Sequence, residues 1–494
     1  MSFPFRNLGA LIDPRADPDK TALIDLSGGT TRHVSYGVLD VLADAIARGL
    51  LHRGLRRSDR VGILAANSTE FLAALYGAQR AGLVAVPVNW RFPPATVEYV
   101  LRDSGAVLVL CDTPRRAAVP TGIPAIAFGT PEWDALPDPG AFEAIAPAPA
   151  EPSLFLYTSG STGKPKGVVL SHQSHLWVVE QRLAGPDMRQ ERVLIAAPLY
   201  HMNGLALAQL ASALHVTVVL LPQFEARAYL RAIGEHRVTW ITGVPPMLAM
   251  LLAERELLAA TDTTCVRHVR CGSAPTSPAL LAAIGEAFPQ ARFVNGYGTT
   301  EAGPVVFGPH PDGLPTPPLS VGYPHPAVRL RLNADSVLEQ RCPGQMNGYW
   351  NRPDIAPPLT ADGFYFTNDV FHRDEHGFHT LVGRIDDMFI SGGENIFPGE
   401  VERVLETHPD VEQSAVIPVA DAIKGTKPVA FVVRQAGAVA DETVLKAHAL
   451  ANAPAYMHPR RIWFVDALPL MGTNKIDRSA LAAMARERLA EAAN

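Results

Sequence analysis

The chain has 494 residues, 47% hydrophobic and 19% charged, with a formal net charge of −6. This composition is typical of a folded globular protein of about three or four domain-sized units, and the charge gives no indication of a nucleic-acid partner. We expect no signal peptide, because no basic region followed by an apolar core opens the chain. We also expect no membrane span and a reducing, cytoplasmic location, because apolar runs stay under about 18 residues and the cysteines lack disulfide or metal-ligand spacing. The cysteines are Cys111, Cys265, Cys271 and Cys342.

Strands and helices alternate through the first 300 residues. Apolar residues recur at helical spacing from Leu39 up to Gly54, and a second helix is expected from Glu70 to Ala81. Strand–helix–strand order at this spacing predicts parallel sheets with crossover helices. Strands are expected at 21–26, 33–36, 60–64, 83–88, 107–111 and 124–128, and in a second series at 193–197, 216–221, 238–242, 266–271 and 292–295.

The remaining third has a different pattern. Residues 129–152 are rich in Pro, Ala, Asp and Glu and are expected to form a crossing loop, and short strands from about 320 indicate a β-rich subdomain. Past Arg384 we expect helix 399–407, strands 412–418 and 428–433, helix 441–450 and a final helix from Arg478. The predicted fold class is α/β: a large N-terminal domain of layered parallel sheets (1–384), a hinge (385–387) and a small, mobile α+β domain (388–494).

One loop is rich in hydroxyls, glycine and lysine. Residues 157–167 read Tyr-Thr-Ser-Gly-Ser-Thr-Gly-Lys-Pro-Lys-Gly and lie between apolar runs that predict strands. Glycines let backbone N–H groups approach a phosphate, hydroxyls donate to it and lysines supply charge. The loop is not a Walker loop, because only two residues separate Gly160 from Gly163 and Pro165 follows Lys164. The alternative is a flexible turn between the two strands. It is the weaker interpretation, because a chance cluster of Ser and Gly would not match a specific pattern at eleven positions.

This loop resembles the phosphate-loop signature of the class I adenylate-forming enzymes, the superfamily of acyl-CoA synthetases, luciferases and peptide-synthetase adenylation domains. The resemblance extends over nearly the whole chain and implies ATP, Mg²⁺ and coenzyme A as cofactors and co-substrates. It implies that the nucleotide is bound by Thr158, Ser159, Gly160, Ser161, Thr162, Gly163 and Lys166; by Gly272, Ser273, Ala274 and Pro275; by Asn295, Gly296, Tyr297, Gly298, Thr299 and Thr300; and by Asp369, Arg384 and Lys475.

The resemblance also implies individual roles. Lys475, Thr162 and Glu301 would be catalytic, with Glu301 holding Mg²⁺, which one carboxylate and phosphate oxygens commonly do. Asp369 would accept from both ribose hydroxyls, since a carboxylate is acceptor-only, and Arg384 would reach the ribose or α-phosphate. The alternatives are a solvated Glu301, an exposed Lys475 and an ion-pair turn at 384–387. Residues 272–275 could equally begin a helix, with Ser277 as its cap and Pro278 at its first position.

Further residues are assigned by the same resemblance to the acid, the CoA arm and the hinge. Asp386 would be the pivot of a domain rotation between two reaction steps. His201 is assigned to the pocket wall, because a lone histidine is more often structural than catalytic. The acid-binding residues would be His201, Met202, Trp240, Gly298, Gly303 and Val305, and the CoA tunnel would be lined by Ser391, Gly392 and Gly393.

Three departures and one histidine group need interpretation. Asn368 and Asn474 stand where the family has glycine, and we expect both to keep a left-handed backbone, which asparagine tolerates best after glycine. The segment 337–343 lacks the family's Gly-Glu lead-in, which leaves its strand pairing open. The histidines at 372, 376 and 379 suggest a hairpin loop rather than a zinc site.

The predicted function is ATP-dependent activation of a carboxylic acid to an acyl-adenylate, then transfer of the acyl group to CoA. We expect a medium-chain or aryl monocarboxylic acid, because the expected pocket segments contain no Arg or Lys. The partners would be this small acid, ATP and CoA, with a homodimer as one expected assembly. Three alternatives stay open: loading of a carrier protein, a luciferase-like oxidation, and nucleotide binding without catalysis.

Overall fold

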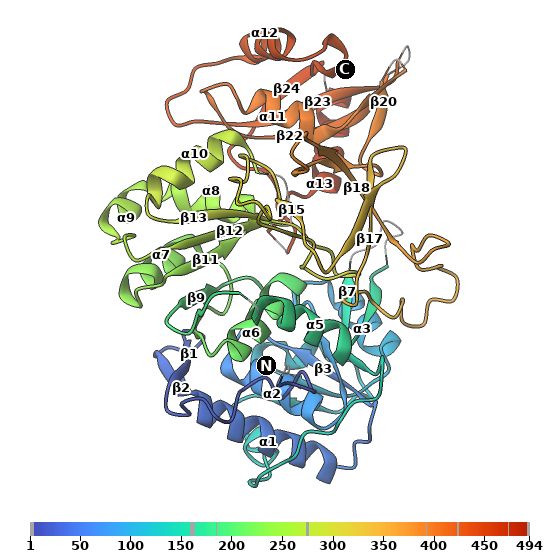
Figure 1. Ribbon diagram of the computed structural model, residues 1–494. Helices are drawn as coiled ribbons and strands as arrows, with labels where there is room; N and C mark the ends of the chain where they lie inside the picture. The colour runs from blue at the N-terminus through green and yellow to red at the C-terminus, as the bar shows by residue number, and fades with distance from the viewer. Residues whose placement is uncertain are drawn as a thin grey trace.

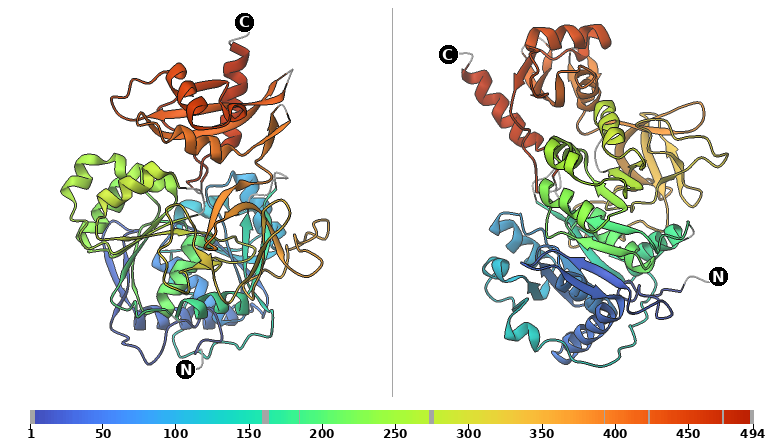
Figure 2. Two further views of the ribbon diagram at one scale, coloured as in Figure 1. Left: turned by 45° about the horizontal axis from the view of Figure 1, so that its top comes forward. Right: turned by 90° about the vertical axis from the view of Figure 1, so that its left-hand side faces the viewer.

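The computed structural model describes residues 4–158, 164–183, 185–272, 276–391, 393–421, 424–472 and 474–491. Two layered α/β sheets form the lower and middle parts of the molecule, a smaller antiparallel sheet with β17 (Val337–Arg341) and β18 (Tyr365–Arg373) lies beside the second of them, and the C-terminal lobe is at the top (Figure 1). Figure 2 shows this lobe standing apart from the two larger sheets. Within the described part of the chain, no helix is long and apolar enough to cross a membrane.

The first large sheet has six strands in the order β6-β5-β3-β4-β7-β8, parallel except for the β7–β8 hairpin. Helix α2 begins at Ser68, whose side chain accepts a hydrogen bond from the Phe71 amide, and nearly every α2 residue is buried. The elements are β3 (Arg60–Leu64), α2 (Thr69–Arg80), β4 (Val84–Pro87), α3 (Pro94–Asp103), β5 (Ala106–Cys111), η1 (Thr113–Ala118), β6 (Ala125–Ala127), α4 (Pro131–Asp134), β7 (Pro152–Thr158) and β8 (Lys166–Ser171). The expected loop at 129–152 therefore contains the one-turn helix α4, which buries Trp133.

The second large sheet has seven strands in the order β13-β12-β11-β9-β10-β1-β2. Its β1 runs parallel to β10, so the first strand of the chain crosses into the second sheet, and helix α1 (Tyr36–His52) packs on α2. The other elements are β1 (Thr21–Asp25), β2 (Arg32–Ser35), α5 (His172–Leu183), β9 (Arg192–Ile195), α6 (Met202–Ala213), β10 (Thr217–Leu220), α7 (Ala226–Glu235), β11 (Trp240–Gly243), α8 (Pro245–Ala253), α9 (Arg255–Ala260), β12 (His268–Gly272), α10 (Pro278–Ala287) and β13 (Arg292–Gly296).

A four-stranded antiparallel sheet follows, in the order β16-β17-β18-β19. Strand β17 pairs with both neighbours, with an irregularity between Val337 and Glu339, so the missing lead-in leaves an ordinary ladder with one bulge. The Asp374 carboxylate accepts from the amides of His376 and Phe378, which confirms the expected hairpin loop. The strands are β14 (Phe307–Gly308), β15 (Tyr323–Pro324), β16 (Arg329–Leu332), β17 (Val337–Arg341), β18 (Tyr365–Arg373) and β19 (His379–Arg384).

The C-terminal lobe is α+β. Its five-stranded sheet buries one face against α11 and α12 and the other against α13, around separate apolar cores. The elements are β20 (Phe389–Ser391), β21 (Glu394–Ile396), α11 (Pro398–Leu405), β22 (Val411–Asp421), β23 (Gly425–Arg434), α12 (Glu442–Asn452), η2 (Ala455–Met457), β24 (Arg461–Phe464) and α13 (Arg478–Glu491). The layered, mainly parallel sheets, the small antiparallel sheet and this α+β lobe confirm the predicted fold class.

Candidate active site

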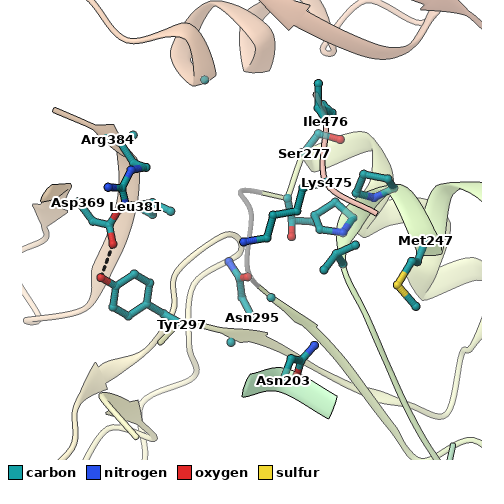
Figure 3. A pocket seen from close by; sticks show the side chains of 18 of the residues that line it. Asn203, Met247, Ser277, Asn295, Tyr297, Asp369, Leu381, Arg384, Lys475 and Ile476 are labelled. Carbon is teal, nitrogen blue, oxygen red and sulfur yellow. Dashed lines mark hydrogen bonds and ion pairs between the residues drawn. The ribbon is translucent and has the colours of Figure 1, made fainter. Parts of the chain in front are cut away.

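A cavity of about 1900 Å³ lies where the carboxyl ends of β11, β12 and β13 meet β18, β19 and the C-terminal lobe. Open α/β sheets bind ligands at this edge, because the strand ends leave a crevice between neighbouring loops. In Figure 3, Lys475 extends from the C-terminal segment toward Asn295, and Asp369, Arg384 and Tyr297 lie on the facing wall. The cavity is therefore built by both lobes.

The hydroxyl-rich loop enters and leaves through two strands that reach this cavity. Thr158 ends β7, Lys166 begins β8, and the two residues are paired across the hairpin. Both line the cavity. The Lys166 ammonium lies 4.8 Å from the centre of the Tyr349 ring. The intervening residues assigned to phosphate, Ser159, Gly160, Ser161, Thr162 and Gly163, lie outside the described residues.

A chain of polar contacts joins Tyr297 and Asp369 to Arg384 and Asp386. The Tyr297 hydroxyl donates to one oxygen of Asp369 (2.5 Å), and the Arg384 guanidinium donates to the other (3.0 Å). Arg384 also makes two bonds to Asp386, of 2.9 and 3.0 Å. Burial raises the pKa of Asp369, although Arg384 opposes this shift. Each carboxylate oxygen has two lone pairs, so Asp369 retains acceptor capacity for hydroxyl groups.

Lys475 lies in a tight turn at the inner face of the C-terminal lobe. The Met471 amide donates to the Lys475 carbonyl (2.7 Å), and the Gly472 carbonyl accepts from Arg91 of the N-terminal domain (3.3 Å). Burial lowers the pKa of Lys475, while Asp369 raises it and Arg384 lowers it further. The ammonium is thus close enough to sense both charged groups of the facing wall.

Both asparagines that replace glycine have left-handed backbones. The φ angle is +63° at Asn368 and +59° at Asn474. Asn368 accepts a hydrogen bond from the Ile385 amide (2.8 Å) on its carbonyl, and the Asn474 amide donates to the Met471 carbonyl (2.8 Å). The hypothesis drawn from the sequence is confirmed: the two turns beside Asp369 and Lys475 keep a backbone that most residues avoid.

The loop after β13 forms a tight turn facing the cavity. Thr299 exchanges backbone hydrogen bonds with Gly303, and its hydroxyl accepts from the Ala302 amide (3.1 Å). Thr300 and Glu301 line the cavity, and the Tyr349 hydroxyl donates to Glu301 (3.2 Å). The Glu301 carboxylate therefore accepts from the same tyrosine whose ring faces the Lys166 ammonium.

The residues predicted to contact the acid divide into two groups. His201, Met202 and Gly298 line the cavity, whereas Gly303 and the fully buried Val305 do not. Burial, aided by Lys475 and Arg91, lowers the pKa of His201 to about 3, so its ring is neutral at physiological pH. This agrees with a wall residue rather than an acid–base group.

Trp240 corrects the expectation for the pocket. It is the first residue of β11 and pairs with His268, the first residue of β12, and their ring centres are 6.4 Å apart. The cavity lies at the opposite, carboxyl ends of these strands, so the structure does not bring Trp240 into it.

The other predicted segments lie at two places. Gly272 ends β12 at the cavity beside Gly296, the last residue of the parallel strand β13, and a Cβ at Gly272 would lie 2.7 Å from the Gly296 carbonyl oxygen. Ser277 caps α10 and Pro278 begins it, which confirms the helix-start interpretation; Ser273, Ala274 and Pro275 lie outside the described residues. Ser391 and Gly393 flank the β20–β21 hairpin away from the cavity lining, and Gly392 lies outside the described residues.

Two arginines, one that contacts the Lys475 turn and one that lines the cavity, were not predicted from the sequence. Arg91 holds the Lys475 turn through Gly472 and also donates to the Gln223 side chain (3.0 Å). Arg270 lines the cavity from the middle of β12. Neither belongs to a recognisable motif; for Arg270 the one available signal was an arginine alternating with Val269 and Cys271 in an otherwise buried strand.

Comparison with known proteins identifies the family. The AMP-binding enzyme family matches residues 13–348, and the AMP-binding enzyme C-terminal domain matches residues 400–475. The feruloyl-CoA synthase of an Amycolatopsis species is 35% identical over 94% of this chain and 95% of its own length. The fatty acid–[acyl-carrier-protein] ligase ScoC of Streptomyces coeruleorubidus is 33% identical over 91% of each chain. The anthranilate CoA ligase AuaEII, solved with anthranoyl-AMP, has a TM-score of 0.89 at 25% identity and covers 99% of both chains. The chain therefore belongs to the AMP-binding family of adenylate-forming enzymes.

Proposed function

We propose that the protein is an AMP-forming acid–CoA ligase that activates a carboxylic acid with ATP and transfers the acyl group to coenzyme A. One observation carries this proposal. Lys475 of the C-terminal lobe enters the same cavity as Thr158 and Lys166, the two ends of the hydroxyl-rich loop. A triphosphate between them would meet cations from both lobes.

The residues suit a two-step reaction. In the first step a substrate carboxylate oxygen attacks the α-phosphorus of ATP, and the bond to the bridging oxygen breaks, which releases pyrophosphate and leaves an acyl-adenylate. In the second step the CoA sulfur attacks the acyl carbon, AMP leaves, and the thiol proton passes to solvent. Positioning and charge stabilisation supply most of the catalysis in phosphoryl-centre displacements. Lys475 donates to the charge that develops around the α-phosphate.

The ribose and the α-phosphate are assigned to the facing wall. Asp369 accepts from the ribose hydroxyls, Tyr297 lies beside the nucleotide, and Arg384 reaches the ribose or α-phosphate. Support comes from the bonds that hold Asp369 between Tyr297 and Arg384 at the cavity surface. Gly272 to Pro275 and Asn295 to Thr300 remain the proposed platform and rim for the adenine.

Mg²⁺ is proposed at Glu301. The described residues contain no group of three or more His, Cys, Asp or Glu side chains that could hold a metal. The Glu301 carboxylate at the cavity fits Mg²⁺, which is often held by one or two carboxylates with phosphate oxygens and water. When bound, the ion neutralises charge on the triphosphate.

The second step is proposed to need a different lobe arrangement. Ser391 and Gly393 do not line the cavity, whereas Lys475 does. Rotation of the lobe 388–494 about Asp386 would bring residues 391–393 to the cavity and withdraw Lys475. The boundaries 1–384, 385–387 and 388–494 remain part of this proposal.

The acid is proposed to have an apolar body of medium-chain or aryl type. Met202, Ala206, Val244 and Met247 line the cavity near the start of α6 and α8, and a relative is named feruloyl-CoA synthase. The segments expected to form the pocket contain no Arg or Lys, which predicted an acid without a second charge. Arg270 lies outside those segments, so that argument no longer holds.

The alternatives give different signals in one experiment. Acid-dependent exchange of labelled pyrophosphate into ATP across an acid panel, repeated with CoA, tests both half-reactions. Turnover only with a pantetheinyl carrier protein would favour the role named for ScoC, and O₂ uptake would favour oxidation. ATP binding without exchange would overturn the ligase. The left-handed Asn368 and Asn474 remove the ground on which a non-catalytic protein was considered. A cytoplasmic location and a homodimer remain predictions.

A further inference from the structure

Arg270 is the central residue of β12 and faces the cavity. Its neighbours Val269 and Cys271 are buried in the core shared with α7, α8 and α10. Side chains alternate along a strand, so Arg270 must project from the opposite face of the sheet. The Arg270 side chain therefore lies on the face of the sheet that lines the cavity.

The guanidinium lies over the backbone of the neighbouring strand. A Cβ built on Gly296 would lie 2.6 Å from Arg270 Nε and 3.0 Å from Nη2. Glycine at 296 therefore leaves the room that the guanidinium occupies. This places its N–H groups at the carboxyl edge of β13, where ligands enter the crevice.

Arg270 has no counter-ion in the described parts of the chain. Among those residues its guanidinium forms no ion pair within 4.0 Å and donates no hydrogen bond. The charged group that acts on it is another cation, Arg182 of α5, which donates to the Pro304 carbonyl (3.4 Å). Burial and Arg182 lower the pKa of Arg270 to about 10. A buried charge without a partner is costly, and a cavity surface lets a ligand supply that partner.

The position of Arg270 favours the acid over the nucleotide. Asp369, Arg384 and Lys475 perturb one another across the nucleotide side, and none of them acts on Arg270. Its neighbour Arg182 lies on α5, which packs against α6. Helix α6 contributes Met202 and Asn203 to the cavity wall. Arg270 thus belongs to the acyl side.

We propose that Arg270 determines acid specificity by binding a second anionic group, a carboxylate or sulfonate, at the end of the acid remote from its reacting carboxylate. A guanidinium offers a planar fork that matches both groups with two parallel hydrogen bonds. The proposal rests on the proposed acid–CoA ligase function and refines its substrate class to an acid with an apolar body and an anionic far end.

Matched pairs of acids test it. Octanoate with suberate, and benzoate with terephthalate, are compared in acid-dependent pyrophosphate exchange with wild type, Arg270→Met and Arg270→Lys. Arg292→Met is the control, an exposed arginine on the same sheet face at the amino end of β13. Wild type and the control should favour the dianionic partner by about 10- to 100-fold in kcat/KM. Arg270→Met should lose this preference through KM for the diacid, with KM for ATP retained, and Arg270→Lys should keep part of it.

A second measurement avoids turnover. In the presence of AMP, suberate should raise the Tm of wild type and of Arg292→Met, and should leave that of Arg270→Met unchanged. Exchange with monoacids together with equal ratios in wild type and Arg270→Met would overturn the role of Arg270 while the ligase stands. A raised KM for ATP in Arg270→Met would assign the residue to the nucleotide and equally overturn it. Absence of exchange with every acid would overturn the proposed function, and absence of a Tm shift by the diacid would then overturn the anion site as well.

Discussion

Replacing Lys475 by alanine should separate the two half-reactions. The ammonium faces the cavity, and the charges of Asp369 and Arg384 both act on its pKa. Truncation leaves no orphaned carboxylate, because Asp369 keeps its bonds from Tyr297 and Arg384. We therefore expect little loss of folding stability, since no buried group loses its only partner.

The magnitude follows from the role. Loss of one preorganised donor to a developing negative charge costs roughly 3–4 kcal/mol in the transition state, or about 100- to 1000-fold in kcat. This loss should fall on adenylate formation. The thioester step should keep most of its rate, since residues 391–393 and not Lys475 are proposed to face the site during that step.

Two assays measure the steps separately: pyrophosphate exchange for the first, and thioester formation from a synthetic acyl-adenylate and CoA for the second. Lys446→Ala is the control, because Lys446 forms a surface pair with Glu442 on α12, and such pairs contribute about 1 kcal/mol or less. Equal losses in both half-reactions of Lys475→Ala would refute the assigned role.

Four further outcomes are expected. Arg91→Ala should lower adenylation by about tenfold and spare the thioester step, because a charged hydrogen bond of roughly 1.5–3 kcal/mol to the Lys475 turn is lost; an unchanged exchange rate would contradict this. Asp386→Pro should impair the second step more than the first, with Asp386→Ala reporting the loss of the ion pair alone; balanced losses would argue against a pivot. Asn474→Gly should retain activity, whereas Asn474→Val should lose about 1–2 kcal/mol of stability in chemical denaturation; equal stability would exclude backbone strain. Burial raises the pKa of Glu406 to about 7, above its unfolded value of about 4.3. Its contribution to the free energy of unfolding is therefore complete below about pH 4 and lost as the pH rises through about 7. Glu406→Gln should flatten this decline by up to about 4 kcal/mol, and parallel denaturation profiles for variant and wild type would refute it.

Local sequence patterns predicted most of the helices and strands. Helical spacing from Leu39 and alternating strand and helix segments correspond to observed elements within a few residues, because burial of one face dictates both periods. The pairing of β1 with β10 could not be read from the sequence, since nothing within β1 specifies which distant strand it joins.

The residues of the candidate site show the same difference between what local sequence patterns predict and what depends on distant parts of the chain. Motif residues at strand ends, such as Asn295 and Gly296, reach the cavity because parallel strands share one carboxyl edge. Trp240 was wrongly assigned to the acid pocket. It is the first residue of β11, at the end of the strand opposite the cavity. Arg91 and Arg270 were missed because their roles depend on what the fold places opposite them.

The contacts of Arg384 with both Asp369 and Asp386 have a consequence for when the C-terminal lobe can rotate. Its guanidinium joins Asp369 to Asp386, so the proposed rotation of the lobe about Asp386 would strain the two hydrogen bonds between Arg384 and Asp386. A phosphate oxygen bound beside Asp369 would compete with Asp386 for the N–H groups of Arg384 and weaken the hydrogen bonds between Arg384 and Asp386. Nucleotide binding and rotation of the lobe would then be coupled through the Arg384 side chain. The enzyme without nucleotide would favour the lobe arrangement that binds ATP.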